Sequence, residues 1–108
     1  MNILANNFMK YNKLVRDKIL EIIKQKGETV ISHIADNEEY WVKLKEKLQE
    51  EVGEFIKDST MEEIADILEV VDAICEFKNF DKTELEELKK KKNMERGGFK
   101  DKIILEEA

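Results

Sequence analysis

Between residues 37 and 78 the sequence carries apolar side chains at helical spacing, with one short interruption at residues 58–60. Apolar residues that recur at intervals of three and four lie on one side of an α-helix. The pattern therefore predicts two long helices, at about 37–57 and 61–78. Because the interruption is short, we expect the two helices to turn back on each other as an antiparallel hairpin.

Capping signals precede both of these helices. The spacing Asp36-x-x-Glu39 resembles a capping box, in which an acceptor side chain satisfies a free backbone N–H of the first turn. Ser59 or Thr60, followed three residues later by an acid, supplies a similar signal before the second helix. The two helix starts are therefore the best defined boundaries in the sequence.

Two further helices are expected outside the hairpin. Asp17 is the expected N-cap of a short helix at 18–26, and Asp81 that of a fourth helix at about 82–95. Both segments are followed by glycine, which is common where a helix ends. These glycines are Gly27, Gly97 and Gly98.

The remaining segments have weaker patterns. Residues 29–35 alternate and are rich in β-branched side chains, which predicts a short strand, and the tail at 101–106 is its expected partner. Residues 1–12 show no periodicity and are expected to form a flexible arm. We therefore expect a single domain over 1–108 that is mainly all-α, a four-helix bundle with a minor two-stranded pairing.

Charge and cysteine content restrict the class of protein. The chain has 19 basic and 25 acidic residues and a net charge of −6, which argues against a protein that binds duplex nucleic acid. A single cysteine excludes a disulfide framework and fits a reducing cytoplasm. No apolar run reaches the ~18 residues of a membrane span, and the N-terminus lacks a signal-peptide core. We therefore expect a cytoplasmic protein without a membrane partner.

Two pairs of acids lie where the hairpin helices are most apolar. In a helical projection Glu63 falls inside the apolar arc of the second helix, and Asp66 lies at its edge. Glu51 lies at the margin of the apolar arc of the first helix, with Glu54 one step further out. Since the end of the first helix lies beside the start of the second, all four carboxylates can converge on one half-buried site.

Such a cluster needs a partner, because unpaired ionised carboxylates out of water are costly and repel one another. Lysines can pair with them, or a hard divalent cation such as Mg²⁺ can take their oxygens as ligands. Spacing alone favours ion pairing, because both helices are rich in Glu and Lys. The place of Glu63 inside an apolar arc favours the cation.

The order of these acids resembles a known family. Glu50-Glu51-x-x-Glu54, followed by Glu63-x-x-Asp66 on the next helix, is similar to the motif of the all-α nucleoside-triphosphate pyrophosphatase (MazG-like) superfamily. A small phosphoribosyl-ATP pyrophosphohydrolase-like branch of that superfamily also resembles this chain in three flanking stretches, and the likeness extends over nearly all of residues 11–105. The stretches are YNKLVRDKI (11–19), EEIADILEVVDAI (62–74) and ERGGFKDKIIL (95–105).

The resemblance implies a hydrolase that depends on Mg²⁺, with Mn²⁺ as an alternative cation. Its reaction would cleave the α–β phosphoanhydride of a nucleoside triphosphate or related nucleotide, giving a monophosphate and pyrophosphate. The metal would polarise the phosphoryl oxygens and lower the pKa of a bound water. The resemblance further implies that Glu50 belongs to the catalytic motif and that four acids hold the metal, namely Glu51, Glu54, Glu63 and Asp66.

A triphosphate also needs cationic side chains. Arg16 and Arg96 are the strongest candidates, because they are the only two arginines and a guanidinium can bind phosphate through two parallel hydrogen bonds. The other candidates also lie near predicted helix ends, where any single lysine is more simply explained as part of a solvated face. They are Lys13, Lys18 and Lys92.

The apolar arc of the second helix covers more than half of its circumference, which one chain of short helices cannot bury alone. We therefore expect a homo-oligomer, a dimer or a tetramer, with the site near the interface. Two alternative functions remain open. One is the narrower activity on phosphoribosyl-ATP in histidine biosynthesis, and the other is a non-catalytic helical scaffold or regulatory oligomer whose acids are paired with lysines.

Overall fold

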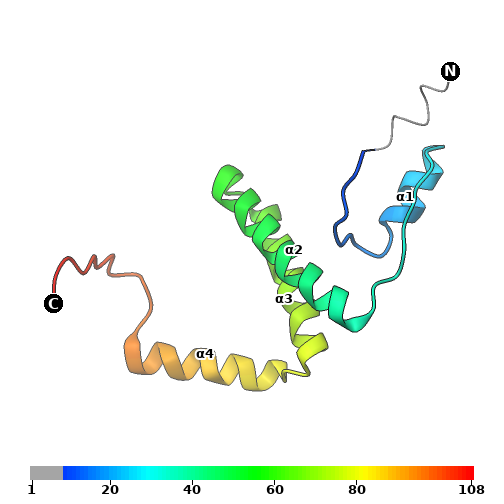
Figure 1. Ribbon diagram of the computed structural model, residues 1–108. Helices are drawn as coiled ribbons and strands as arrows, with labels where there is room; N and C mark the ends of the chain where they lie inside the picture. Colours follow the sequence, from blue (N-terminus) through cyan, green and yellow to red (C-terminus); the bar gives the residue numbers. More distant parts are fainter. Residues whose placement is uncertain (1–8) are drawn as a thin grey trace. The chain divides into compact units, whose positions relative to one another are not determined.

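The computed structural model describes residues 9–108, and over that range it contains four α-helices and no strand (Figure 1). The all-α prediction is confirmed, and every predicted helix boundary lies within one residue of the observed one. The arm predicted at 1–12 falls mostly outside the described residues. The helices are α1 (Ile19–Gln25), α2 (Asn37–Asp58), α3 (Met61–Lys78) and α4 (Lys82–Arg96).

The predicted β pairing of 29–35 with 101–106 is wrong, because neither segment is a strand. The tail begins in a turn, in which the N–H of Lys102 donates to the carbonyl of Phe99 and Lys102 has a φ of 59°. A left-handed residue interrupts an extended strand. Strand propensity depends on a paired neighbour, so β-branched composition at 29–35 was insufficient evidence.

Asp17 is not the cap of α1, contrary to the prediction. The residue before the helix is Lys18, which already has helical backbone angles and makes no side-chain capping hydrogen bond. The carbonyl of Arg16 accepts a hydrogen bond from the N–H of Ile19 at 3.0 Å. A backbone turn therefore starts this helix. Its end agrees with the prediction, since Gly27 has a φ of 81°, a conformation that glycine adopts without strain.

The chain forms two compact units, one up to Ala73 and one from Ile74 to Ala108. The first contains α1, α2 and most of α3. The second contains the last turn of α3, all of α4 and the C-terminal tail. Among the described helices none is both long enough and apolar enough to cross a lipid bilayer.

In the first unit α2 and α3 form the expected antiparallel hairpin, joined only by Ser59 and Thr60 (Figure 1). The N–H of Ser59 donates to the carbonyl of Phe55 at 2.7 Å, and Ser59 has a φ of 55°, so the chain turns sharply there. Leu44 on α2 is fully buried and Val70 on α3 is 7% exposed. Burial of such aliphatic side chains stabilises the hairpin by about 1.5–3 kcal/mol each.

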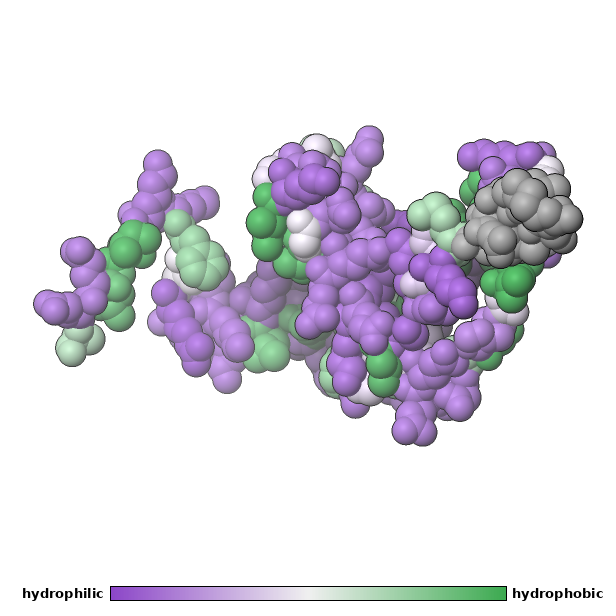
Figure 2. All heavy atoms as spheres, turned by 45° about the horizontal axis from the view of Figure 1, so that its top comes forward, coloured by the Kyte–Doolittle hydropathy of each residue, from purple (hydrophilic) through white to green (hydrophobic). Residues whose placement is uncertain are grey.

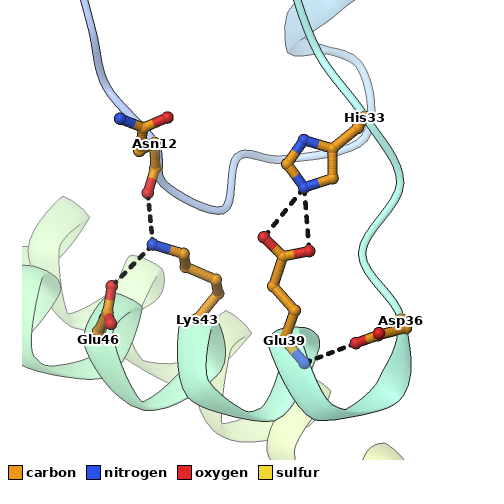
Figure 3. A network of polar contacts seen from close by, with 6 residues as sticks. All are labelled: Asn12, His33, Asp36, Glu39, Lys43 and Glu46. Carbon is orange, nitrogen blue, oxygen red and sulfur yellow. Dashed lines mark hydrogen bonds and ion pairs between the residues drawn. The ribbon is translucent and has the colours of Figure 1, made fainter.

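Polar contacts at the start of α2 attach two irregular segments to the helix (Figure 3). Asp36 accepts a hydrogen bond from the N–H of Glu39 at 2.8 Å, as the capping box predicted. The carboxylate of Glu39 lies 2.9 Å from Nε2 of His33, and Nζ of Lys43 donates to the carbonyl of Asn12 at 2.7 Å. The chain just before α1 is thereby held against α2.

In the second unit, Asp81 caps α4 as predicted, accepting hydrogen bonds from the N–H groups of Thr83 and Glu84 at 2.7 and 3.1 Å. Gly97 ends the helix with a φ of 80°, and its N–H donates to the carbonyl of Asn93. Every residue of α4 is exposed. Strong local capping therefore defines this helix.

Candidate functional site

The five acids of the motif lie near the closed end of the α2–α3 hairpin. Glu50, Glu51 and Glu54 belong to the last turns of α2, and Glu63 and Asp66 belong to the first two turns of α3. A helix rises about 1.5 Å per residue, so all five lie within about 12 Å of the turn along the helix axes. The hairpin alone brings the two halves of the motif to the same end of the molecule's first unit.

The segment before α1 binds to both helices of the hairpin through cations. Nζ of Lys13 lies 2.6 Å from Oε1 of Glu50 on α2, and Nη2 of Arg16 lies 2.8 Å from Oδ1 of Asp66 on α3. Residues 13–16 therefore cross one side of the hairpin. We call this side the acidic face and define it by Glu50, Glu51 and Asp66.

A second lysine, which sequence analysis missed, completes this arrangement. Nζ of Lys47 lies 2.7 Å from Oε2 of Glu50 and 3.3 Å from Oε1 of Glu51. Only 16% of the Lys47 side chain and 13% of the Glu51 side chain are exposed, so this pair is the best shielded part of the acidic face. The signal was present in the sequence, because residues three and four apart on a helix are neighbours.

The charges shift the titration of two of these groups. Burial alone would raise the pKa of Glu50, but the hydrogen bonds from Lys13 and Lys47, together with the attraction of their charges, outweigh it and hold the pKa below its ordinary value of 4.5. The hydrogen bond to Glu50 raises the pKa of Lys13 above its ordinary value of 10.5, against a smaller opposing effect of burial. Both groups are therefore charged at neutral pH, and each stabilises the charge of the other.

Glu63 has a local partner. Its carboxylate accepts a hydrogen bond from Oγ1 of Thr60 at 2.9 Å, and its N–H donates to the same hydroxyl at 3.3 Å. The expected helix-start signal is thus made by Thr60. Capping accounts for an acid at this half-buried position without any cation, which weakens the sequence argument that Glu63 alone favours a metal.

The four predicted metal ligands do not form a ready cage. Glu51 is paired with Lys47, Asp66 with Arg16, and Glu63 with Thr60, while Glu54 is exposed. Across residues 9–108, no group of three or more acidic, histidine or cysteine side chains is close enough to hold a metal ion. Carboxylate oxygens are the ligands that Mg²⁺ prefers, so these four side chains are chemically suited to hold the ion. In the structure, however, Glu51 and Asp66 form ion pairs with basic side chains.

The basic candidates divide into two groups. Lys13 and Arg16 contact the acidic motif. Lys18 is exposed at the start of α1, and Lys92 and Arg96 are exposed on α4 in the second unit. The assignment of these last three residues to substrate phosphates remains a prediction.

Comparison with known proteins gives one partial relative. A protein of Mycolicibacterium smegmatis (strain ATCC 700084 / mc(2)155), described as an uncharacterized protein, is 45% identical to this chain over 42 residues. The match covers 39% of this chain and 43% of the relative, so the chain spans less than half of that protein's length. No family model and no solved structure matches the chain.

Proposed function

We propose that this chain is a Mg²⁺-dependent nucleotide pyrophosphohydrolase of the MazG-like kind. It would cleave the α–β phosphoanhydride of a nucleoside triphosphate or related nucleotide and release pyrophosphate. One observation supports this most: Lys13 and Arg16, which the sequence indicated as phosphate ligands, lie 2.6 and 2.8 Å from Glu50 and Asp66 of the acidic motif. Residues with complementary roles in such a reaction thus share one face.

The ion pairs of this face are suited to exchange partners. Arg16 and Asp66 keep 55% and 39% of their side chains exposed, and exposed ion pairs typically contribute only about 0–1 kcal/mol to stability. A bound triphosphate therefore competes easily for the guanidinium, and a divalent cation competes for the carboxylate. Without substrate, the opposite charges neutralise one another.

The proposed roles follow from these contacts. Glu51, Glu54, Glu63 and Asp66 would hold Mg²⁺, which when bound polarises phosphoryl oxygens and lowers the pKa of a bound water. In this proposal Arg16 and Lys13 bind the phosphate charges.

Two further side chains contact and orient the carboxylates of the motif. Lys47 orients the carboxylates of Glu50 and Glu51, because its Nζ lies 2.7 and 3.3 Å from them, and its hydrogen bond helps to lower the pKa of Glu50. Thr60 fixes the carboxylate of Glu63 through its hydroxyl. A cytoplasmic location, expected from the single cysteine, belongs to the same proposal.

The proposal is tested by measuring pyrophosphate release from a panel of nucleoside triphosphates and phosphoribosyl-ATP, with and without Mg²⁺. The wild type is compared with Glu63→Gln, and Glu62→Gln serves as a matched control because Glu62 is exposed on the same turn of α3. We expect Mg²⁺-dependent turnover that Glu63→Gln abolishes and Glu62→Gln preserves. Turnover that is absent for every substrate, or independent of metal, would overturn it.

A second candidate function is a non-catalytic helical scaffold or regulatory oligomer. It is favoured by the ion pairs that already satisfy Glu50, Glu51 and Asp66 within the chain. For a scaffold, Asp66→Asn changes stability alone, and the wild type binds no divalent cation. Isothermal titration with Mg²⁺ separates the two candidates without any assumption about the substrate.

A further inference from the structure

The segment just before α1 carries its two cations on either side of two apolar residues. The side chains of Lys13 and Arg16 are 42% and 55% exposed, whereas Leu14 and Val15 between them are half-buried. Figure 2 shows that the visible surface of the chain is largely hydrophilic, so water reaches the charged side chains there. The apolar residues thus hold the segment near the protein, while its cations remain accessible to ligands in solution.

The backbone of the segment is fixed at both ends. Nζ of Lys43 on α2 donates to the carbonyl of Asn12 at 2.7 Å (Figure 3). Asn12 has a φ of 47°, a left-handed conformation that asparagine tolerates better than most residues. At the other end the carbonyl of Arg16 accepts a hydrogen bond from the N–H of Ile19 at 3.0 Å. The two cationic side chains can therefore exchange partners without the backbone leaving the hairpin.

Arg16 occupies a carboxylate that the proposed function assigns to the metal. Its Nη2 lies 2.8 Å from Oδ1 of Asp66. A guanidinium that is hydrogen-bonded to this oxygen keeps a metal ion away from it, and two positive charges a few ångströms apart repel each other. Arg16 and a divalent cation therefore compete for Asp66.

The second cation holds the same segment against α2. Nζ of Lys13 lies 2.6 Å from Oε1 of Glu50, and Lys47 contacts the other oxygen of Glu50 and one oxygen of Glu51. All three acids of the acidic face thus have a basic side chain within 3.3 Å. A metal ion that arrives alone has to displace one of these cations and leave it without its anion.

We propose that residues 12–16 form an inhibitory segment, in which Arg16, supported by Lys13, holds Asp66 in place of the metal until a phosphorylated ligand offers both cations another anion. The inference rests on the proposed function, because it takes Asp66 as a ligand of the metal. Phosphate, like carboxylate, accepts parallel charge-assisted hydrogen bonds from a guanidinium, so Arg16 stays paired when it moves to phosphate. Metal and phosphate then bind more tightly together than either binds alone, and the coupling is equal in both directions.

Removal of Arg16 should accordingly have opposite effects on two ligands. It takes away a phosphate contact, so binding of the nucleotide weakens. It also frees Asp66, so binding of the metal alone strengthens. A residue that merely supported the position of Asp66 would change metal binding in the other direction.

Electron paramagnetic resonance of Mn²⁺ with the full chain, in the absence of nucleotide, tests the competition. We expect Arg16→Gln to bind Mn²⁺ about fivefold more tightly than the wild type, the factor that corresponds to the upper end of an exposed ion pair. Lys24→Gln is the matched control, because it removes an equal charge from an exposed position of α1. It should leave the affinity for Mn²⁺ unchanged.

Nuclear magnetic resonance of the arginine side chains observes the displacement itself. The chain has two arginines, so the Nε–H region contains two signals, and the one that Arg16→Gln lacks belongs to Arg16. We expect this signal in the wild type to shift as Mg²⁺ is added. In Asp66→Asn, where the ion pair is absent from the start, the signal of Arg16 should not respond to Mg²⁺.

The proposal is overturned if Arg16→Gln binds Mn²⁺ no more tightly than the wild type, or if saturating Mg²⁺ leaves the signal of Arg16 unmoved. Either result leaves the proposed function in place when pyrophosphate release still depends on Mg²⁺. If neither the wild type nor Arg16→Gln binds Mn²⁺, both the inhibitory segment and the assignment of the metal to these carboxylates are wrong. Circular dichroism checks the fold of the variants, and the titration of the wild type with Mg²⁺ gives an answer even if a variant is unstable.

Discussion

Arg16 and Asp66 are separated by 50 positions in the chain, yet Nη2 of the first lies 2.8 Å from Oδ1 of the second. Together with Lys13 and Glu50, 37 positions apart, this pair fixes the segment before α1 across both helices of the hairpin. Two acids of the motif, Glu50 and Asp66, are thereby paired with the cations that the proposed function assigns to phosphate binding. Four predictions follow from this arrangement and from the capping of α3.

Arg16→Gln should raise KM for the nucleotide about tenfold, because one charge-assisted contact to phosphate is worth roughly 1.5 kcal/mol. Stability should change little, since the Arg16–Asp66 pair is exposed. Steady-state kinetics of pyrophosphate release measures the effect, and Lys24→Gln on the exposed side of α1 is the control. Unchanged KM and kcat would remove Arg16 from the site.

Asp66→Asn and Glu51→Gln should each weaken divalent-cation binding, because each removes an anionic ligand from the proposed set. Electron paramagnetic resonance of Mn²⁺ measures the affinity directly, without substrate. Glu69→Gln, on the exposed side of α3, should bind Mn²⁺ as the wild type does. Equal affinity in all four proteins means that these carboxylates serve only as ion-pair partners, and chelation should then leave turnover unaffected.

The Lys13–Glu50 pair should make stability depend on pH at both extremes. The pKa of Glu50 is lower in the folded protein than its ordinary 4.5, so its contribution is present above that value and is lost as pH falls through the folded pKa. The pKa of Lys13 is raised above 10.5, so its contribution is complete below that value and is lost as pH rises through the folded pKa.

Urea unfolding at a series of pH values measures both losses. Glu50→Gln should remove the loss of folding stability at acid pH that comes from this pair. Lys13→Met should remove the corresponding loss at alkaline pH. Glu38→Gln, an exposed acid on the first turn of α2, provides the comparison. Identical pH profiles for Glu50→Gln and wild type would mean that the pair makes no measurable contribution to folding.

Thr60→Ala should destabilise the hairpin by about 0.5–2 kcal/mol, the usual effect of removing a helix cap. The hydroxyl of Thr60 both accepts from the N–H of Glu63 and donates to its carboxylate, so Thr60→Ser should restore most of the loss. Thermal unfolding measures both variants. If the Thr60→Ala and Thr60→Ser variants are equally stable, the cap does not contribute to folding stability and the carboxylate of Glu63 requires another partner.

The sequence by itself determined the four helices and most of their ends. Caps such as Asp36, Thr60 and Asp81 act on N–H groups two or three residues away, so the signal and its effect lie in the same short stretch. The short link between α2 and α3 likewise required an antiparallel hairpin, which placed both halves of the acidic motif at one end.

Only the tertiary structure decided which charges meet. Lys13 reaches Glu50, and Arg16 reaches Asp66, because the carbonyl of Asn12 is anchored by Lys43 on α2, and no periodicity encodes a contact over such separations. The predicted strand at 29–35 failed for a related reason, since a strand exists only with a neighbour to pair with. Helices satisfy their backbone hydrogen bonds locally, whereas ion pairs and sheets depend on where distant segments come together.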